Sequence, residues 1–95
     1  MELTKEILIS NGFKTNHEDR VLPTFYCYSP KNDADWRIMV TSEYLPLKNV
    51  FTFNCDIQVC DVKGTIVKRA TLTDVRTIED LNTILSLAGI NKEVK

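Results

Sequence analysis

The chain has no long hydrophobic run and no leader-like beginning. Nowhere in its 95 residues does an apolar stretch approach the roughly 18 residues that a membrane-spanning helix needs. The N-terminus also lacks the basic start and apolar run of a signal peptide. Its three cysteines are an odd number and do not form a closed disulfide framework. We therefore expect a soluble, cytoplasmic protein with reduced thiols and no membrane partner.

An excess of charge of either sign is missing too. Twelve Lys and Arg are balanced by thirteen Asp and Glu, which gives a net charge of -1, and the basic residues are scattered along the chain. Affinity for a nucleic-acid backbone needs a concentrated positive surface. The best local cluster, formed by Lys63, Lys68 and Arg69, is small. The composition therefore speaks against a nucleic-acid partner.

Glycine and histidine are too scarce for the common catalytic motifs. With three glycines the chain contains no Gly-x-Ser-x-Gly elbow, phosphate-binding loop or Gly-x-Gly-x-x-Gly fingerprint. The single histidine, His17, lies in a polar stretch typical of an exposed loop. Cys55 and Cys60 are five residues apart on one expected strand, so they point to opposite faces unless a bulge intervenes and cannot share a metal ion. Asp33 and Asp35 fit a turn. We expect no catalytic residues, no metal and no cofactor.

What the sequence does contain is two short helices that can be recognised from their ends. The first is expected over residues 4–11, with a threonine N-cap at its first position and Gly12 as its stop signal. The second begins after Thr77, which is followed three residues later by Asp80 as in a capping box, and it stops at Gly89. Its apolar stripe consists of Ile78, Leu81, Ile84, Leu85 and Ala88.

Between the helices the apolar pattern changes to a period of two, which is typical of strands. Over residues 51–59 the odd positions are apolar and the even positions are polar, which predicts a long strand with one buried face. Residues 62–64 predict a turn, and residues 65–72 predict the returning strand of a hairpin. Residues 36–41 and 25–29 supply two further strands.

The order of these elements predicts the fold class. Residues 29–35 and 44–49 are rich in turn formers and predict short loops, so the strands should form an antiparallel sheet. On the last strand Ile66, Ala70 and Leu72 are expected to face the core. The chain is too short for a second core, so residues 1–95 should form one α+β domain. We predict an N-terminal helix, a four-stranded antiparallel meander sheet and a C-terminal helix, with both helices packed on one sheet face.

The sheet face away from the helices supplies the candidate functional surface. Asn54, Asp56 and Gln58 follow one another on the polar side of the long strand, although the solvated side of any half-buried sheet shows the same row. Tyr26 and Tyr28 share one side of their strand, and amphipathic aromatic residues are enriched at protein interfaces. The candidate interaction surface consists of Tyr26, Tyr28, Trp36, Asn54, Asp56 and Gln58.

Two segments carry a resemblance to known sequences. They are LISNGF at residues 8–13 and IEDLNTILSLAGI at residues 78–90, and short strands are expected between them. In this combination the chain resembles small uncharacterised proteins of gut bacteria and of their phages or other mobile elements. The resemblance brings no catalytic residues. What it implies is an accessory function that acts by binding.

Three hypotheses from different classes remain open. The first is a non-enzymatic protein-interaction or accessory module whose partner is another protein or a second copy of the chain in a homodimer. The second is a small-molecule or nucleic-acid binding domain that uses the open sheet face with Asn54, Asp56, Gln58, Lys68 and Arg69. The third is a thiol-dependent enzyme built around Cys60 or Cys27 with His17.

Overall fold

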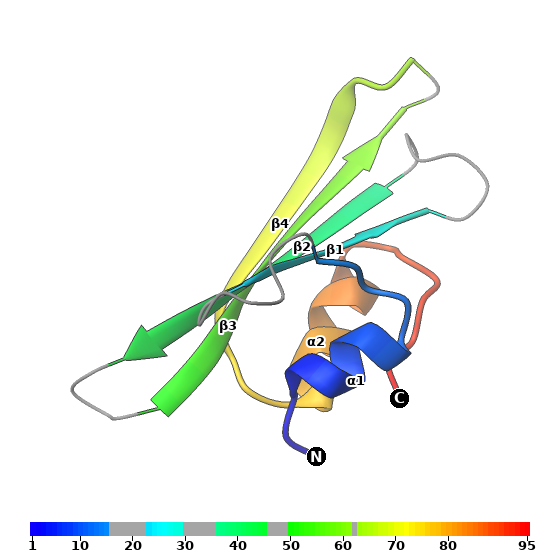
Figure 1. The fold of residues 1–95 in the computed structure, drawn as a ribbon. Coiled ribbons are helices and arrows are strands. Elements are labelled where there is room, and N and C mark those ends of the chain that lie inside the picture. The colour runs from blue at the N-terminus through cyan, green and yellow to red at the C-terminus, as the bar shows by residue number, and fades with distance from the viewer. Residues whose placement is uncertain (16–22, 30–35, 46–49, 62) are drawn as a thin grey trace.

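The computed structural model describes residues 1–15, 23–29, 36–45, 50–61 and 63–95. Its elements, in chain order, are α1 (Lys5–Ser10), β1 (Thr24–Tyr28), β2 (Trp36–Leu45), β3 (Val50–Cys60), β4 (Ile66–Val75) and α2 (Ile78–Leu87). The strands form one antiparallel sheet in the order β1-β2-β3-β4, and both helices lie on the same side of it (Figure 1). The predicted α+β meander with a helix at each end is confirmed.

The ends of α1 follow from its local sequence. At its start the Oγ1 of Thr4 accepts a hydrogen bond from the backbone N–H of Ile7 at 3.2 Å, as an N-cap does. At its end Gly12 adopts a φ of +88°, where a side chain would be strained, and the N–H of Phe13 donates to the carbonyl of Leu8 at 3.0 Å. This is a Schellman motif, and it turns the buried Phe13 ring back onto the core.

The ends of α2 repeat this arrangement with a full capping box. Thr77 Oγ1 accepts from the N–H of Asp80 at 3.0 Å, and the Asp80 carboxylate accepts from the N–H of Thr77 at 3.3 Å. Gly89 has a φ of +77°, and the N–H of Ile90 donates to the carbonyl of Leu85 at 3.0 Å. Both helix ends therefore lie where the sequence predicts them.

The core lies between the sheet and the two helices. On β2 and β3, Val40 stands opposite Cys55 and Ile38 stands opposite Ile57, and all four side chains are buried. The helices contribute buried residues of their apolar sides, and Ala70 and Leu72 of β4 pack against this core half-buried, as predicted. The largest fully buried side chains are those of Leu8, Pro23, Phe25, Ile38, Val40, Thr52, Cys55, Ile57, Val75, Leu81, Leu85 and Val94.

The prediction for Ile66 was wrong, and a β-bulge is the reason. Val59 pairs with Lys68, but the next residue, Cys60, pairs with Ile66, so Val67 is an additional residue on β4. The insertion ends the simple alternation of faces along the strand. Ile66 is 47% exposed instead of facing the core.

A second irregularity lies at the other end of β4. Phe53 pairs with Val75 while Cys55 pairs with Leu72, so β4 again carries one residue more than β3. Asp74 takes a positive φ of +58° there. The strand therefore continues to Val75, beyond the predicted limit at residue 72, because pairing resumes after the insertion.

The loop predicted over residues 44–49 begins later in the structure. Tyr44 pairs with Phe51 and Leu45 with Val50, so the ladder extends β2 through Leu45. Residues 46–49 lie outside the described part of the chain, as do most residues of the predicted loop 29–35.

Two asparagine side chains hold the C-terminal segment. Asn82 donates through Nδ2 to the carbonyl of Val94 at 2.9 Å and accepts from the N–H of Val94 at 2.7 Å. Asn11 makes the same pair of bonds with Lys95, at 3.1 and 3.0 Å. The amides replace the backbone partners that a strand would supply, which fixes the buried Val94 against α2.

Candidate functional site

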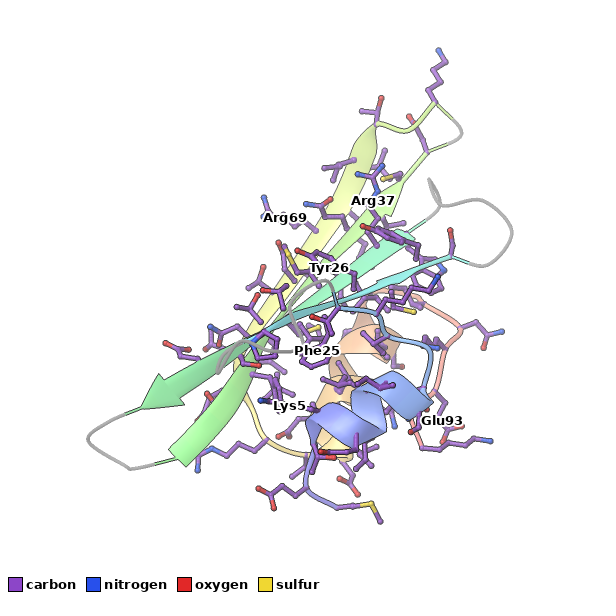
Figure 2. The ribbon with its side chains drawn as sticks, viewed as in Figure 1. Lys5, Phe25, Tyr26, Arg37, Arg69 and Glu93 are labelled. Atoms are coloured by element: carbon purple, nitrogen blue, oxygen red, sulfur yellow. The ribbon has the colours of Figure 1, made fainter. Side chains whose placement is uncertain are left out.

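The outer face is the face of the sheet opposite to α1 and α2, which carries no helix among the described residues. On it Tyr26 of β1 stands directly opposite Met39 of β2, and Tyr28 stands opposite Arg37. Directly paired residues of antiparallel strands lie on the same face with Cβ atoms about 5 Å apart. These four residues, the tyrosine–arginine patch, therefore form one cluster across two strands. Figure 2 shows Tyr26 and Arg37 along the sheet, away from α1 and α2.

A shallow hollow of about 120 Å³ lies at this patch. Its rim is completed by Asp56 and Gln58 of β3, which pair with Met39 and Arg37 respectively. Tyr28 is 48% exposed, and the side chain of Arg37 is exposed and makes no ion pair with any described residue. The hollow therefore combines aromatic and thioether surface with one available cation.

An ion pair occupies the outer face beside the patch. Arg69 of β4 binds the Asp56 carboxylate in a fork, with Nε to Oδ1 at 3.2 Å and Nη2 to Oδ2 at 2.8 Å. Thr71 Oγ1 donates to the same carboxylate at 3.2 Å. The hydrogen bond from Arg69, together with its charge, lowers the pKa of Asp56. The charge of Arg69 is therefore balanced within the protein.

Asn54 has an internal role on the outer face. Its Nδ2 donates to Glu43 at 2.8 Å, and its Oδ1 accepts from the N–H of Asp74 at 3.4 Å. Asn54 thereby links β2 to the irregular end of β4. Both ends of its amide are engaged within the sheet. Asn54 does not line the hollow, whose β3 residues are Asp56 and Gln58.

The structure brings together five of the six residues of the predicted interaction surface. Tyr26, Tyr28, Asn54, Asp56 and Gln58 share the outer face. Trp36 does not, and its grouping with the two tyrosines is corrected. It has the same parity on β2 as the buried Ile38 and Val40, and it packs against the core on the helix side.

Arg37 and Met39 were missed as site residues. They alternate with Trp36, Ile38 and Val40 in the sequence, so an expected β2 already placed them on the opposite side from the core. What the sequence lacked was the register, which sets Tyr28 opposite Arg37 and makes the cluster visible.

The residues of the nucleic-acid hypothesis are divided between the two faces. Lys68 Nζ donates to the carbonyl of Leu87 at 3.1 Å, which places this amine beside α2. Arg69 lies on the outer face with its charge paired to Asp56. The predicted basic cluster is thus not one surface.

The cysteines are free and buried. Burial raises the pKa of Cys27, and it raises that of Cys55 to about 12 with a further contribution from the charge of Asp56. A thiolate nucleophile needs the opposite shift. His17 lies outside the described residues, and among the described residues no three His, Cys, Asp or Glu side chains are grouped to hold a metal ion.

A larger hollow of about 360 Å³ lies between the N-terminal segment and the ends of β2 and β3, lined in part by Leu3, Ser42, Thr52 and Phe53. The Thr52 side chain is 1% exposed, and its Oγ1 has no hydrogen-bond partner among the described residues. A single bound water molecule would satisfy this buried oxygen.

Comparison with protein-family models, curated proteins and solved structures finds no match for this chain. Within the described residues, no helix has the length and apolar character needed to cross a membrane. The class that the coordinates define is an α+β protein whose antiparallel sheet carries both described helices on one face.

Proposed function

We propose that this chain is a non-enzymatic interaction module that binds another protein through the tyrosine–arginine patch. The observation that carries the proposal is the juxtaposition of Tyr26 with Met39 and of Tyr28 with Arg37 on the sheet face opposite to α1 and α2. Tyr, Met and Arg are the residue types enriched at the centre of protein interfaces.

The charges on the outer face favour a protein over a nucleic acid as partner. Arg69 is neutralised by Asp56, and Lys68 reaches toward α2. Arg37 of the patch and the exposed Lys14, which bridges to Tyr26 from beyond β1, are then two cations, too few for a phosphate backbone, which is bound by several cations at once. A single guanidinium beside aromatic surface suits a carboxylate on a protein partner.

The hollow adds a steric requirement to this partner. Its 120 Å³ accommodate one medium-sized apolar side chain, with the rings of Tyr26 and Tyr28 as walls. A partner segment with an apolar anchor and a nearby Asp or Glu would fill the hollow and pair with Arg37. Interfaces concentrate their energy in such anchors.

The test uses the double substitution Tyr26→Ser and Tyr28→Ser. Proteins retained by the immobilised wild-type chain are identified, and the binding of each is measured with purified components. Loss of two interface tyrosines is expected to weaken binding at least about tenfold, since a hot-spot truncation costs about 1.4 kcal/mol or more. Arg37→Ala should weaken the same interaction.

Leu87→Ser is the matched control, because Leu87 is also an apolar side chain and is 70% exposed, but it lies on α2. It should bind as the wild type does. Circular dichroism confirms that each variant is folded. Equal affinity of the double tyrosine variant and the wild type would contradict the proposal, as would a partner whose binding is lost only with Leu87→Ser.

A further inference from the structure

A third hollow, of about 350 Å³, lies where the C-terminal segment after α2 meets the end of β1 and the start of β2 (Figure 1). It is lined by Cys27 and Tyr28 of β1, by Trp36 of β2, and by Asn91 and Lys92 of the C-terminal segment. Small-molecule sites in proteins measure about 300–1,000 Å³. The hollow therefore has room for one compact organic molecule.

Lys92 brings a positive charge to this hollow, and its ammonium group is held in place. Nζ donates to the carbonyl oxygen of Asn11 at 2.9 Å and lies 5.9 Å from the centre of the Phe13 ring. An ammonium group has three donors, of which the bond to Asn11 uses one. A carbonyl oxygen carries no net charge, and Lys92 makes no ion pair with any residue that the structure describes. Lys92 is therefore a positioned cation without a counter-ion.

The surroundings of this cation favour an anion as ligand. None of the described residues that line the hollow is acidic. Burial raises the pKa of Cys27, and the charges of Lys92 and Lys14 act against that rise, so both ammonium groups lie within electrostatic reach of a thiol in the wall of the hollow. Lys92 is half-buried, and a charge that loses hydration without gaining a partner is costly. An anion in the hollow would offset that cost.

Trp36 gives the hollow an aromatic wall. Its side chain is half-buried and packs against the core from the helix side of the sheet, which fixes the plane of the indole. Aromatic rings that stack or meet edge to face gain energy beyond the area that they bury. The exposed Asn91 adds an amide that can donate to a ligand oxygen. The lining thus combines a flat apolar surface with polar donors.

We propose that this hollow, the Trp36–Lys92 hollow, binds a small aromatic carboxylate. The carboxylate accepts a hydrogen bond from Nζ of Lys92, and the ring of the ligand lies against the indole of Trp36. A hydrogen bond between an ammonium and a carboxylate is about twice as strong as one between neutral groups. A neutral ligand of the same shape loses this gain, and a small aliphatic anion loses the ring contact.

This site is separate from the proposed protein-binding function, although Tyr28 lines both hollows. Lys92 is not part of the tyrosine–arginine patch, which lies on β1 and β2. A change at Lys92 that leaves both tyrosines and Arg37 in place should leave the binding of a protein partner unchanged. Failure of the ligand proposal and failure of the protein-binding proposal are therefore distinguishable.

The test is a titration with phenylacetate, with phenylacetamide as its neutral counterpart. Trp36 is the only tryptophan of the chain, so its fluorescence and its indole N–H resonance in the NMR spectrum of the isotope-labelled protein report on this hollow alone. Phenylacetate should shift both signals with a Kd of about 1 mM or tighter, as a ligand of about ten non-hydrogen atoms reaches at ordinary efficiency. Phenylacetamide and acetate should each bind at least about tenfold more weakly.

Lys92→Gln removes the charge but keeps a side-chain donor for the carbonyl of Asn11. It should weaken phenylacetate binding at least about tenfold and leave the weak binding of phenylacetamide unchanged. Lys95→Gln is the matched control, because it makes the same change of charge at an exposed residue of the same segment that does not line the hollow. It should bind phenylacetate as the wild type does, and circular dichroism confirms that both variants are folded.

Three results would overturn the inference. The first is a set of Trp36 signals that phenylacetate leaves unmoved at concentrations far above the expected Kd. The second is equal affinity for phenylacetate and phenylacetamide, which would remove the role of the charge. The third is an equal effect of Lys92→Gln and Lys95→Gln, whether both weaken binding or neither does, because Lys92 would then hold no special place.

Discussion

Asn82→Ala tests whether the C-terminal segment is held by side-chain amides. Asn82 lies in α2 and makes two hydrogen bonds with the backbone of Val94, at 2.9 and 2.7 Å. Alanine removes both bonds without introducing bulk. The Val94 side chain is 1% exposed, so its position in the core depends on how its backbone is held.

The magnitude follows from three contributions. Two hydrogen bonds contribute about 1 kcal/mol each to the free energy of unfolding. Alanine has a higher helix propensity than asparagine, which returns about 0.6 kcal/mol. The net loss is therefore about 1.5 kcal/mol, which lowers Tm by about 6–12 °C for a domain of this size. If the segment detaches and exposes Val94, the loss rises to about 4 kcal/mol.

Urea unfolding followed by circular dichroism measures this loss. Asn91→Ala is the control, because Asn91 lies in the same segment and is exposed, and it should change stability by less than about 0.5 kcal/mol. In a chain that ends at residue 93, Asn82→Ala should become slightly stabilising, since only the propensity gain remains. An equal loss in the full and the shortened chain would refute the explanation.

Further predictions concern pH, thiol reactivity and a helix end. The pKa of Asp56 is lower in the folded chain, so the stability that its carboxylate contributes is present above about pH 4 and is lost as the pH falls through the folded pKa. The urea midpoints of the wild type and of Asp56→Asn should therefore converge in acid. Cys55 has a raised pKa of about 12, so the stability contributed by its protonated form is lost as the pH rises above about 8.5 toward that value. Alkylation of Cys55 at pH 8, followed by mass spectrometry, should be much slower in the folded chain than in urea, and equal rates would refute its burial. Gly89→Ala should cost about 1 kcal/mol in thermal unfolding because φ is +77°, and Gly89→Asn should cost less.

The parts of the fold that depend on neighbouring residues could be predicted from the sequence. Thr77 with Asp80, and Gly89 with Ile90, specify the start and end of α2 within a few residues of chain, so no distant contact is needed to recognise them. The alternation of residues 51–59 likewise indicates a strand with one buried face. The antiparallel order follows because short connections leave few alternatives.

The bulges could not be predicted in the same way. Val67 is an additional residue of β4 that has no counterpart on β3, and for this reason Ile66 lies on the other face of the sheet. The position of such an insertion depends on how the two strands pair, which the sequence of β4 alone does not contain. The hydrogen bonds between the Asn82 side chain and the Val94 backbone pose the same difficulty, since a polar helix residue does not indicate which distant backbone groups it will bind. Long-range register is the common missing information.

The candidate site shows the same division between local pattern and register. Alternation alone places Tyr26 and Tyr28 on one side of β1, but it does not say which β2 residues stand opposite them. Trp36 attracts attention as an aromatic residue, yet its parity with Ile38 assigns it to the core side, whereas the less conspicuous Arg37 completes the patch. Residue type therefore suggested a candidate surface, and strand pairing shows which residues lie side by side on it. The same reasoning makes Arg37→Ala more informative than a change at Trp36. Arg37 is exposed, so its loss removes a cation of the patch without disturbing the core, whereas Trp36 packs against the core.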